Sequence, residues 1–300
     1  MKHDCVALKL IAIVSVIVTV MIACASVGYG EESETVSFGE FQFEDVFLHK
    51  GEEPVLTDDK YKSENISIEI RKFRQDNSDV FVADIYIKSL DMLQRVYGFD
   101  KWGYGSQAIG KMAERHSAVL AITGDDAHVL EKGIVYGNGQ LLRKTINNSR
   151  ELGIIFMDGT MEIMPGRDVK VKDLEALEKD IWHLFLFGPG LLDENGKAKT
   201  QFTSKVRQEN PRAVIGYYEP GHYCFVQVDG RKTKSVIEDG KKNYGMTLAQ
   251  LATLMEQLGC KAAYNLDGGR SSMMWFNGQV LNNPEKGGRK IGDIICIPEI

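Results

Sequence analysis

From residue 66 onward, apolar and polar residues follow the periods of regular secondary structure. Ile66, Ile68 and Ile70 alternate with polar residues, and a similar period of two runs from Phe81 to Ile87. This period is typical of strands that bury one face. Apolar runs bounded by turn residues predict further strands at 118–122, 153–157, 160–164, 181–187, 214–217, 223–228, 261–266, 273–276 and 279–281.

Helical periodicity is confined to short stretches. Apolar residues recur at helical spacing from Leu248 to Leu258, after Thr247, which stands three residues before Gln250 as in a capping box. Shorter helices are predicted at 106–116 and 173–180. Because predicted strands outnumber helices and no repeat is visible, we predict an α+β fold: a single domain built on a large mixed β-sheet with flanking helices.

The N-terminal residues follow a different pattern. An unbroken apolar run from Leu10 to Ala23 comes after two lysines, which is the order found in secretory signal peptides. If it is not cleaved, the segment is long enough to anchor the chain in a membrane. We therefore expect residues 1–30 to be a signal peptide or membrane anchor, and the protein to be extracytoplasmic. Residues 31–65 are acidic and are predicted to be a spacer before a domain at 66–300.

Charge and cysteine content exclude some classes of function. The 300 residues carry a formal net charge of -6 and no basic block, so we expect no nucleic-acid partner. Outside the leader, Cys224, Cys260 and Cys296 form no CxxC pair, which argues against a structural zinc site. Each lies in an apolar strand or beside a helix end, and we expect buried free thiols.

A dense group of polar residues comes at the end of the predicted strand at 261–266. Asn265 precedes the carboxylate of Asp267, and Gly268 and Gly269 are followed by Arg270, Ser271 and Ser272. Glycines let the backbone approach a ligand closely and present amide groups to an anion. A glycine-rich turn with polar ends would have the same sequence, so this run alone leaves both interpretations open.

Two more charged positions lie at strand ends. Arg212 follows Asn210 and Pro211 before a predicted strand, where a guanidinium suits bidentate binding of phosphate or carboxylate. Asp125 and Asp126 follow the strand at 118–122, and adjacent carboxylates repel each other unless one binds a ligand, a cation or a proton. An exposed arginine and a solvated turn are the alternatives.

Seven blocks of sequence, taken in order, resemble the phosphodiester glycosidase family, whose bacterial members are often described as exopolysaccharide biosynthesis proteins. The resemblance covers about residues 80–300. The blocks are ITGDD (122–126), GIVYGNGQLLR (133–143), LFLFGPGLL (184–192), NPRAVIGYYEPGHY (210–223), VDGR (228–231), GMTLAQLATLMEQLGCKAAYNLDGGRSS (245–272) and NGQVLNNP (277–284).

The resemblance implies an exported hydrolase that cleaves the bond between a sugar anomeric carbon and phosphate in a phosphodiester-linked glycan. Its motifs place at the site Asn210, Arg212, Asp229, Arg231, Asp267, Gly268, Gly269, Ser271 and Ser272. Such cleavage passes through an oxocarbenium-like state that a carboxylate stabilises. We expect Asp267 and Asp125 to flank the anomeric carbon, and Arg212 and the turn amides to hold the phosphate. Asn265 and the two serines would orient these groups.

Departures from the family pattern keep two alternatives open. Thr123 stands where Asn is usual, Asp126 where an aromatic residue is usual, and Arg270 where Gly is common. One alternative is a metal-dependent phosphodiesterase in which Asp125, Asp126 and Asp267 bind a divalent cation. The other is a non-catalytic glycan-binding protein of the cell envelope. The glycosidase interpretation itself requires no cofactor, and the sequence identifies no metal site. A membrane partner is expected only through an uncleaved N-terminal segment.

Overall fold

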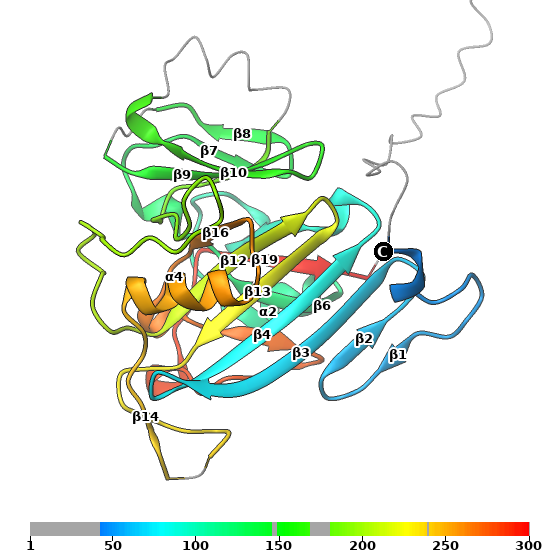
Figure 1. Cartoon of the computed structure of the whole chain (residues 1–300). Helices are drawn as coiled ribbons and strands as arrows, with labels where there is room; N and C mark the ends of the chain where they lie inside the picture. The colour runs from blue at the N-terminus through cyan, green and yellow to red at the C-terminus, as the bar shows by residue number, and fades with distance from the viewer. Residues whose placement is uncertain (1–42, 146–148, 169–180, 239, 300) are drawn as a thin grey trace, which may run out of the picture. The chain divides into compact units, whose positions relative to one another are not determined.

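The computed structural model describes residues 43–299, apart from 146–148, 169–180 and 239 (Figure 1). All of these residues belong to the second of two compact units, Val36–Ile300. The leader at 1–30 and the helix expected at 173–180 lie outside the described residues. Within the described part of the chain, no helix has the length and apolar character needed to cross a membrane.

A seven-stranded sheet is the largest element of the fold, with the order β1-β2-β3-β4-β13-β12-β16. Its strands are β1 Val55–Leu56, β2 Lys60–Lys62, β3 Ile66–Gln75, β4 Ser78–Ile87, β12 Arg212–Glu219, β13 His222–Val228 and β16 Ala262–Asn265. Every neighbouring pair in this sheet is antiparallel. β1 and β2 come from the segment expected to be a spacer, and β2 pairs with β3 along its whole length.

Two five-stranded sheets and one small ribbon complete the described strands. One sheet, in the order β18-β17-β6-β19-β5, comprises β5 Gln94–Tyr97, β6 Ala118–Thr123, β17 Met274–Phe276, β18 Gln279–Val280 and β19 Asp293–Pro298. The other, in the order β10-β9-β11-β7-β8, comprises β7 Val135–Gly137, β8 Gln140–Arg143, β9 Glu151–Phe156, β10 Met161–Pro165 and β11 Ile181–Phe185. The ribbon pairs β14 Thr233–Lys234 with β15 Lys242–Asn243.

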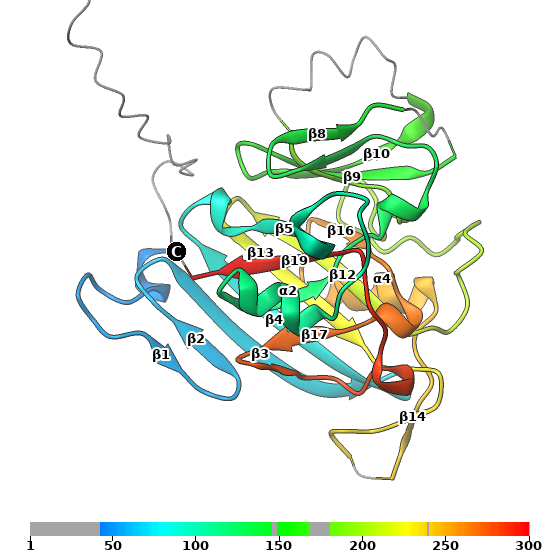
Figure 2. The same ribbon diagram turned by 180° about the vertical axis from the view of Figure 1, so that it is seen from behind.

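Two α-helices cover the sheets within the described residues. α4 (Leu248–Gln257) begins with the predicted capping box, in which the Gln250 amide donates to Thr247 Oγ1 at 3.2 Å. The leucines of α4 pack on the seven-stranded sheet, whereas α2 (Ile109–Arg115) packs on the sheet of β6 and β19. Figures 1 and 2 show where the two helices lie. Short 3-10 helices lie at Glu44–Val46, Leu90–Met92, Gly98–Asp100, Ala127–Val129, Gly166–Asp168, Gly269–Ser271 and Glu285–Gly287.

The main hydrophobic core lies between the seven-stranded sheet and the sheet of β6 and β19. Phe81 and Phe225 from the first sheet share this core with Ile122 and Ile295 from the second, and all four are fully buried. The predicted alternation is confirmed in β3, where Ile66, Ile68 and Ile70 face this core. β4 differs, because its residues from Phe81 to Ile87 face this core at every second position while Val80 and Val82 are buried on the opposite face against α4. Cys224, Cys260 and Cys296 are buried free thiols, as expected.

The fold contains more strand and fewer helical layers than expected. We predicted one large mixed sheet with flanking helices, whereas every strand pairing described is antiparallel and the strands divide among several sheets. Tight hairpins such as β9–β10, predicted from Asp158-Gly159, account for this, because parallel neighbours need long crossover connections. The sequence pattern did not predict β5, β7, β8, β14, β15 or β19, and β1 and β2 lie in the segment expected to be a spacer.

One edge of the two packed sheets gathers the loops with the candidate site residues. β12 begins at Arg212, opposite Val228 at the end of β13, and Val214 lies opposite Asn265 at the end of β16. In the second sheet, Thr123 at the end of β6 lies opposite Ile294 near the start of β19. Antiparallel pairing therefore brings these strand ends together.

Candidate active site

A pocket of about 260 Å³ lies at this edge. Its lining residues are Phe187, Val206, Asn210, Pro211, Arg212, Arg231, Asp267, Gly268, Gly269, Arg270 and Arg289. Four of these are arginines, whereas the only acidic residue among them is Asp267. Guanidinium groups bind phosphate and carboxylate through charge-assisted, often bidentate hydrogen bonds. The lining therefore favours an anionic ligand.

The glycine-rich turn after β16 is pressed against the segment before β12. A Cβ on Gly268 would lie 2.6 Å from the carbonyl oxygen of Pro211, so no other residue fits without moving the backbone. The Gly269 amide donates to the same oxygen at 3.0 Å, and Gly269 has a φ of +65°. This close approach places the Asp267 turn beside Arg212.

The turn is also tied to the loop after β6. The Asp267 amide donates to the carbonyl oxygen of Gly124 at 3.0 Å. Thr123, which replaces the asparagine usual in the family, is buried and donates its hydroxyl to the carbonyl oxygen of Ser271. These bonds connect the two packed sheets at the site, so Thr123 has a structural role there.

Arg212 is a buried cation with no acidic partner among the described residues. Its side chain is 2% exposed, and it donates to the carbonyl oxygens of Met246 (2.8 Å), Val206 (2.7 Å) and Gln208 (2.5 Å). Burial and the nearby charge of Arg231 lower the pKa of Arg212 to about 10, which leaves it protonated at neutral pH. Because an unpaired buried charge is costly, a bound anion would stabilise this group.

Arg231 reaches the pocket from the segment after β13. Its Nη1 atom pairs with Glu285 Oε2 at 2.6 Å, and its Nη2 atom donates to Asn210 Oδ1 at 3.1 Å. Two sequence-predicted residues, Asn210 and Arg231, therefore contact each other at the rim. Arg270 is held by a bond from its Nη2 atom to the carbonyl oxygen of Gly288 at 3.1 Å.

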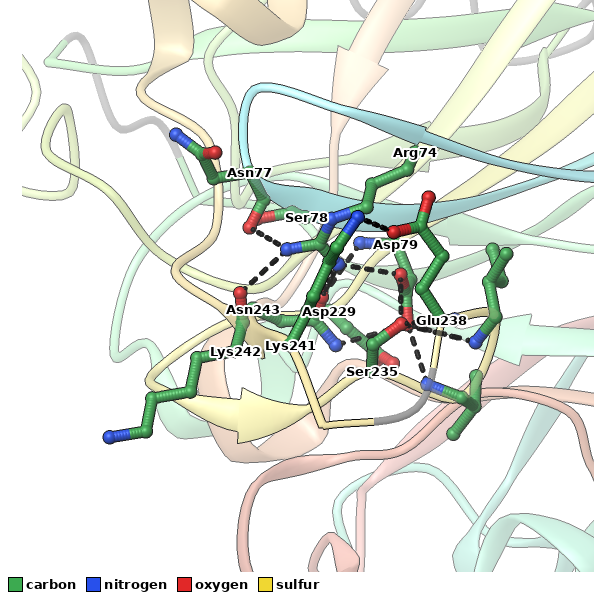
Figure 3. A network of polar contacts seen from close by, with 12 residues as sticks. Arg74, Asn77, Ser78, Asp79, Asp229, Ser235, Glu238, Lys241, Lys242 and Asn243 are labelled. Carbon is green, nitrogen blue, oxygen red and sulfur yellow. Dashed lines mark hydrogen bonds and ion pairs between the residues drawn. The ribbon is translucent and has the colours of Figure 1, made fainter.

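A buried polar network holds the segment that follows Arg231 (Figure 3). The carboxylate of Asp79 accepts hydrogen bonds from the Ser235 hydroxyl at 2.7 Å, the Val236 amide at 2.7 Å and Arg74 Nη1 at 2.9 Å. Burial alone would raise the pKa of Asp79, but the bonds from Ser235 and Val236 lower it. Because its oxygens are occupied by protein donors, this carboxylate is structural.

Asp267 is the buried acid of the pocket. It is 5% exposed, and its Oδ2 atom accepts a hydrogen bond from Arg289 Nη2 at 2.8 Å. Arg289 Nε in turn donates to Ser271 Oγ at 2.5 Å. Burial raises the pKa of Asp267, while a hydrogen bond from Ser271 and the charge of Arg289 oppose the rise.

Asp126 supplies a second carboxylate to the same guanidinium. Its Oδ2 atom lies 3.7 Å from Arg289 Nη2, and its Oδ1 atom lies 3.1 Å from His128 Nδ1. Burial, followed by the negative charge of Asp267, raises the pKa of Asp126 to about 7. The structure therefore pairs two carboxylates across Arg289, one of which gains a proton near neutral pH.

Asp125, which the sequence paired with Asp267, lies elsewhere. It is fully buried, forms an ion pair with Arg95, and accepts from the amides of Leu186 (2.5 Å) and Ala127 (3.1 Å). It does not line the pocket. Because both oxygens are occupied, Asp125 is unsuited to contact a substrate. Asp126 also lies outside the pocket lining, but it approaches Asp267 through Arg289, which does line the pocket. In the described ranges, no three His, Cys, Asp or Glu residues form a group suited to a metal ion.

Three other predicted residues lie outside the pocket lining and are buried. Asp229 accepts from Asn282 Nδ2 at 2.7 Å and from the Asn283 amide at 2.9 Å, and burial raises its pKa to about 6. Asn265 Nδ2 donates to the carbonyl oxygen of Gly188 at 2.9 Å. The carbonyl oxygen of Ser272 accepts a hydrogen bond from Asn282 Nδ2 at 3.1 Å. These residues fix loops around the pocket.

The pocket thus brings together six of the predicted residues and adds others. The six are Asn210, Arg212, Arg231, Asp267, Gly268 and Gly269, with Ser271 one bond away through Arg289. Sequence reasoning did not find Arg289, His128 or Phe187. The only signal for Arg289 is the Gly287-Gly288 pair before it, which resembles an ordinary turn.

Comparisons with known proteins agree with this architecture. The chain is 26% identical over 261 residues to an uncharacterized SPbeta prophage-derived protein of Bacillus subtilis, covering 78% of this chain but only 38% of that relative. The catalytic domain of zebrafish N-acetylglucosamine-1-phosphodiester alpha-N-acetylglucosaminidase, auto-inhibited by its pro-peptide, superposes with a TM-score of 0.60 at 20% identity, covering 78% of this chain and 83% of that one. A hypothetical protein from Synechocystis gives 0.50 at 16% identity, over 78% and 62% of the respective chains.

Those two structures establish a shared fold. A family model described as phosphodiester glycosidase matches residues 116–298, which include Asp126, Arg212, Asp267 and Arg289. Because the match extends over more than half of the chain and contains the pocket, the protein belongs to the phosphodiester glycosidase family.

Proposed function

We propose that the protein hydrolyses the bond between a sugar anomeric carbon and phosphate in a phosphodiester-linked glycan. The observation that carries this proposal is the pocket itself, in which one buried carboxylate stands among four arginines. Arginines suit the phosphate, and a carboxylate suits the positive charge that develops at the anomeric carbon. Family membership and the shared fold with the zebrafish catalytic domain support the same reaction.

The phosphate binds to Arg212 and to the amides of the glycine turn. Arg212 Nη1 makes no hydrogen bond within the described residues, whereas Nε and Nη2 are fixed by carbonyl oxygens. The guanidinium is therefore held in place before the ligand arrives. Preorganised cations stabilise the negative charge that builds up on the departing phosphate.

Asp267 acts as the ionised carboxylate at the anomeric carbon, as base or nucleophile. Arg289 lies 2.8 Å from it and favours its charged form. Asp126, with a pKa of about 7, is protonated in a large fraction of molecules at neutral pH and serves as the general acid. Two carboxylates with different environments are the usual requirement of glycoside hydrolysis.

The proposal includes export of the chain by residues 1–30. The apolar run from Leu10 to Ala23 after two lysines supports it. A phosphate-containing glycan of the cell envelope would then be accessible as a substrate. The reaction needs water as co-substrate and no cofactor, so chelators should leave the rate unchanged.

Hydrolysis in water labelled with heavy oxygen tests the reaction. The purified protein is incubated with an N-acetylglucosamine 1-phosphodiester, and both products are analysed by mass spectrometry. Cleavage at the anomeric carbon places the label in the sugar. Label in the phosphate would instead identify a phosphodiesterase, and binding without turnover would identify a glycan-binding protein.

Asp267→Asn is the matching variant, with Asp58→Asn as its control. Asp58 is an exposed carboxylate between β1 and β2, so its replacement removes the same charge far along the chain from the pocket. The glycosidase proposal requires loss of turnover in the first variant and normal turnover in the second.

A further inference from the structure

A second and larger cavity adjoins the pocket. Its volume is about 950 Å³, compared with about 260 Å³ for the pocket. Phe187 and Val206 line both cavities, so the two share a wall. A ligand held at Asp267 that extends past Phe187 and Val206 would enter this second cavity, which we call the basic groove. The basic groove is large enough to hold the part of the substrate that lies on the phosphate side of the cleaved bond.

The charges of the basic groove are unlike those of the whole chain. Its lining includes Arg150, Arg167, Lys199 and Lys205 but a single acidic residue, Glu151. The whole chain has a formal net charge of -6. A cleft lined by one sign of charge concentrates ligands of the opposite sign, even where the protein as a whole would repel them.

Contacts within the groove fix its acid and one of its arginines. Glu151 pairs with Lys199 at 2.8 Å, and its other oxygen accepts from the Gly190 amide at 3.0 Å. Glu151 is thus occupied by Lys199 and the Gly190 amide, and it forms no ion pair with Arg150 or Lys205. Arg150 Nη1 donates to the carbonyl oxygen of Phe187 at 2.7 Å. This bond sets the Arg150 guanidinium next to the wall that the two cavities share.

Apolar residues line the groove together with these cations. Pro165, Pro189 and Phe202 are among them, and Phe187 is half-buried at the junction with the pocket. Apolar side chains pack against the carbon-bound faces of sugars or polyols, while the cations bind phosphates. The lining therefore suits a chain that contains both carbon-rich units and phosphates.

We propose that the basic groove binds the phosphate-bearing side of the substrate, and that the substrate is an anionic polymer with a phosphodiester in each repeat. This inference rests on the proposed function, because it assigns the groove to the chain that leaves with the phosphate. The phosphate at the cleaved bond lies in the pocket, and the next phosphates along the polymer contact Arg150 and Lys205. The basic groove then selects long substrates, and the pocket at Asp267 carries out the cleavage.

Two labelled probes test the groove: an N-acetylglucosamine 1-phosphodiester with one phosphate, and an oligomer of the same unit with a phosphodiester in every repeat. Their binding to the Asp267→Asn variant is measured by fluorescence anisotropy, so that no probe is consumed. We expect the oligomer to bind at least tenfold more tightly. Lys205→Glu and Arg150→Gln, added singly, should each reduce oligomer affinity about tenfold, the effect of one charge-assisted contact.

Lys72→Glu provides the matched control. Lys72 is exposed on β3, so this variant makes the same change of charge outside the groove. It should leave the affinity of both probes unchanged. Because Lys205 is exposed, we expect Lys205→Glu to fold normally. The test can therefore be completed with this variant even if Arg150→Gln fails to fold.

The outcomes separate the groove from the proposed reaction. Equal affinity for the two probes, or an equal loss of affinity in Lys72→Glu and Lys205→Glu, would overturn the groove proposal. The wild-type protein would in that case still cleave the single phosphodiester. Failure of the wild-type protein to cleave either probe would count against the proposed function, whichever way the binding experiment ends.

Discussion

Asp125 and Asp126 are neighbours in the sequence, yet the structure gives them opposite environments. Asp125 is fully buried, and Arg95 and two backbone amides occupy its oxygens. Asp126 is partly exposed and meets Arg289 only at 3.7 Å, with Asp267 bound to the same guanidinium. The carboxylate of Asp125 is part of a buried ion pair, whereas the carboxylate of Asp126 shares the guanidinium of Arg289 with Asp267.

This comparison shows what separates a structural acid from a reactive one. A buried ion pair with all its hydrogen bonds made has no capacity left for a ligand. Burial and the nearby carboxylate of Asp267 raise the pKa of Asp126, which is the condition for acid catalysis. Burial also raises the pKa of Asp125, but protein groups occupy both of its oxygens. Asp126 adopts a left-handed conformation (φ 50°) just before the 3-10 helix Ala127–Val129.

The largest effect is expected from Asp267→Asn. Removing the carboxylate at the anomeric carbon should reduce kcat by about 10³- to 10⁴-fold. The change is nearly isosteric, so the melting temperature should stay within a few degrees. Steady-state kinetics and a thermal scan check both parts, with Asp58→Asn as the control. Normal turnover would remove Asp267 from the mechanism.

The second largest effect is expected from Asp125→Asn, on stability. Breaking a buried ion pair leaves Arg95 short of one partner and should lower the free energy of unfolding by about 3 kcal/mol. Asp293 remains bound to Arg95 Nε at 2.7 Å, which places the loss at the lower end of the usual range. Denaturant unfolding measures it. A variant of normal stability that lacks activity would make Asp125 catalytic and reverse the comparison.

Asp126→Asn should reduce kcat about 100-fold at neutral pH, the usual size of one general-acid contribution. In the wild-type protein, the active form carries the Asp126 proton, so the rate should fall as the pH rises above about 7. The variant should lack this alkaline limb. A limb that persists in the variant would assign it to another group.

Stability provides a check on Asp126 that does not depend on activity. Its pKa of about 7 in the folded protein is above the value of about 3.9 for an unfolded chain. Its stabilising contribution is therefore complete below about pH 4 and is lost as the pH rises through about 7. Relative to wild type, Asp126→Asn should become more stable between pH 4 and pH 8. A constant difference would contradict the raised pKa.

The smallest effect is expected from Ser271→Ala. The variant loses the hydroxyl that accepts from Arg289 at 2.5 Å, and one hydrogen bond corresponds to about a fivefold loss in kcat/KM. It also removes a bond that lowers the pKa of Asp267, so the acid limb of the pH profile should move to higher pH. An unchanged acid limb would mean that Asp267 is not the group that must be ionised.

Local patterns in the sequence determined many of the elements and the chemical types at the site. The alternation in β3 and β4, the capping box of α4 and the Asp158-Gly159 hairpin follow from contacts between residues near in sequence. The turn at Asp267-Gly268-Gly269 was identified because its residue types are unusual at the end of an apolar strand. Such features need no knowledge of the tertiary structure.

Only the tertiary structure decided which charged groups meet. Arg289 and Asp267 lie 22 positions apart in the sequence and contact each other in the structure. Gly124 connects their surroundings, because it accepts from the Asp267 amide and donates to Asp293 at the start of β19. Arg95 occupies Asp125 from 30 positions away, a pairing that no local pattern reveals. Long-range ion pairs depend on how sheets pack and on which oxygens remain unoccupied. Two adjacent residues of the same type therefore differ in role: Asp125 is structural, and Asp126 is a candidate catalytic residue.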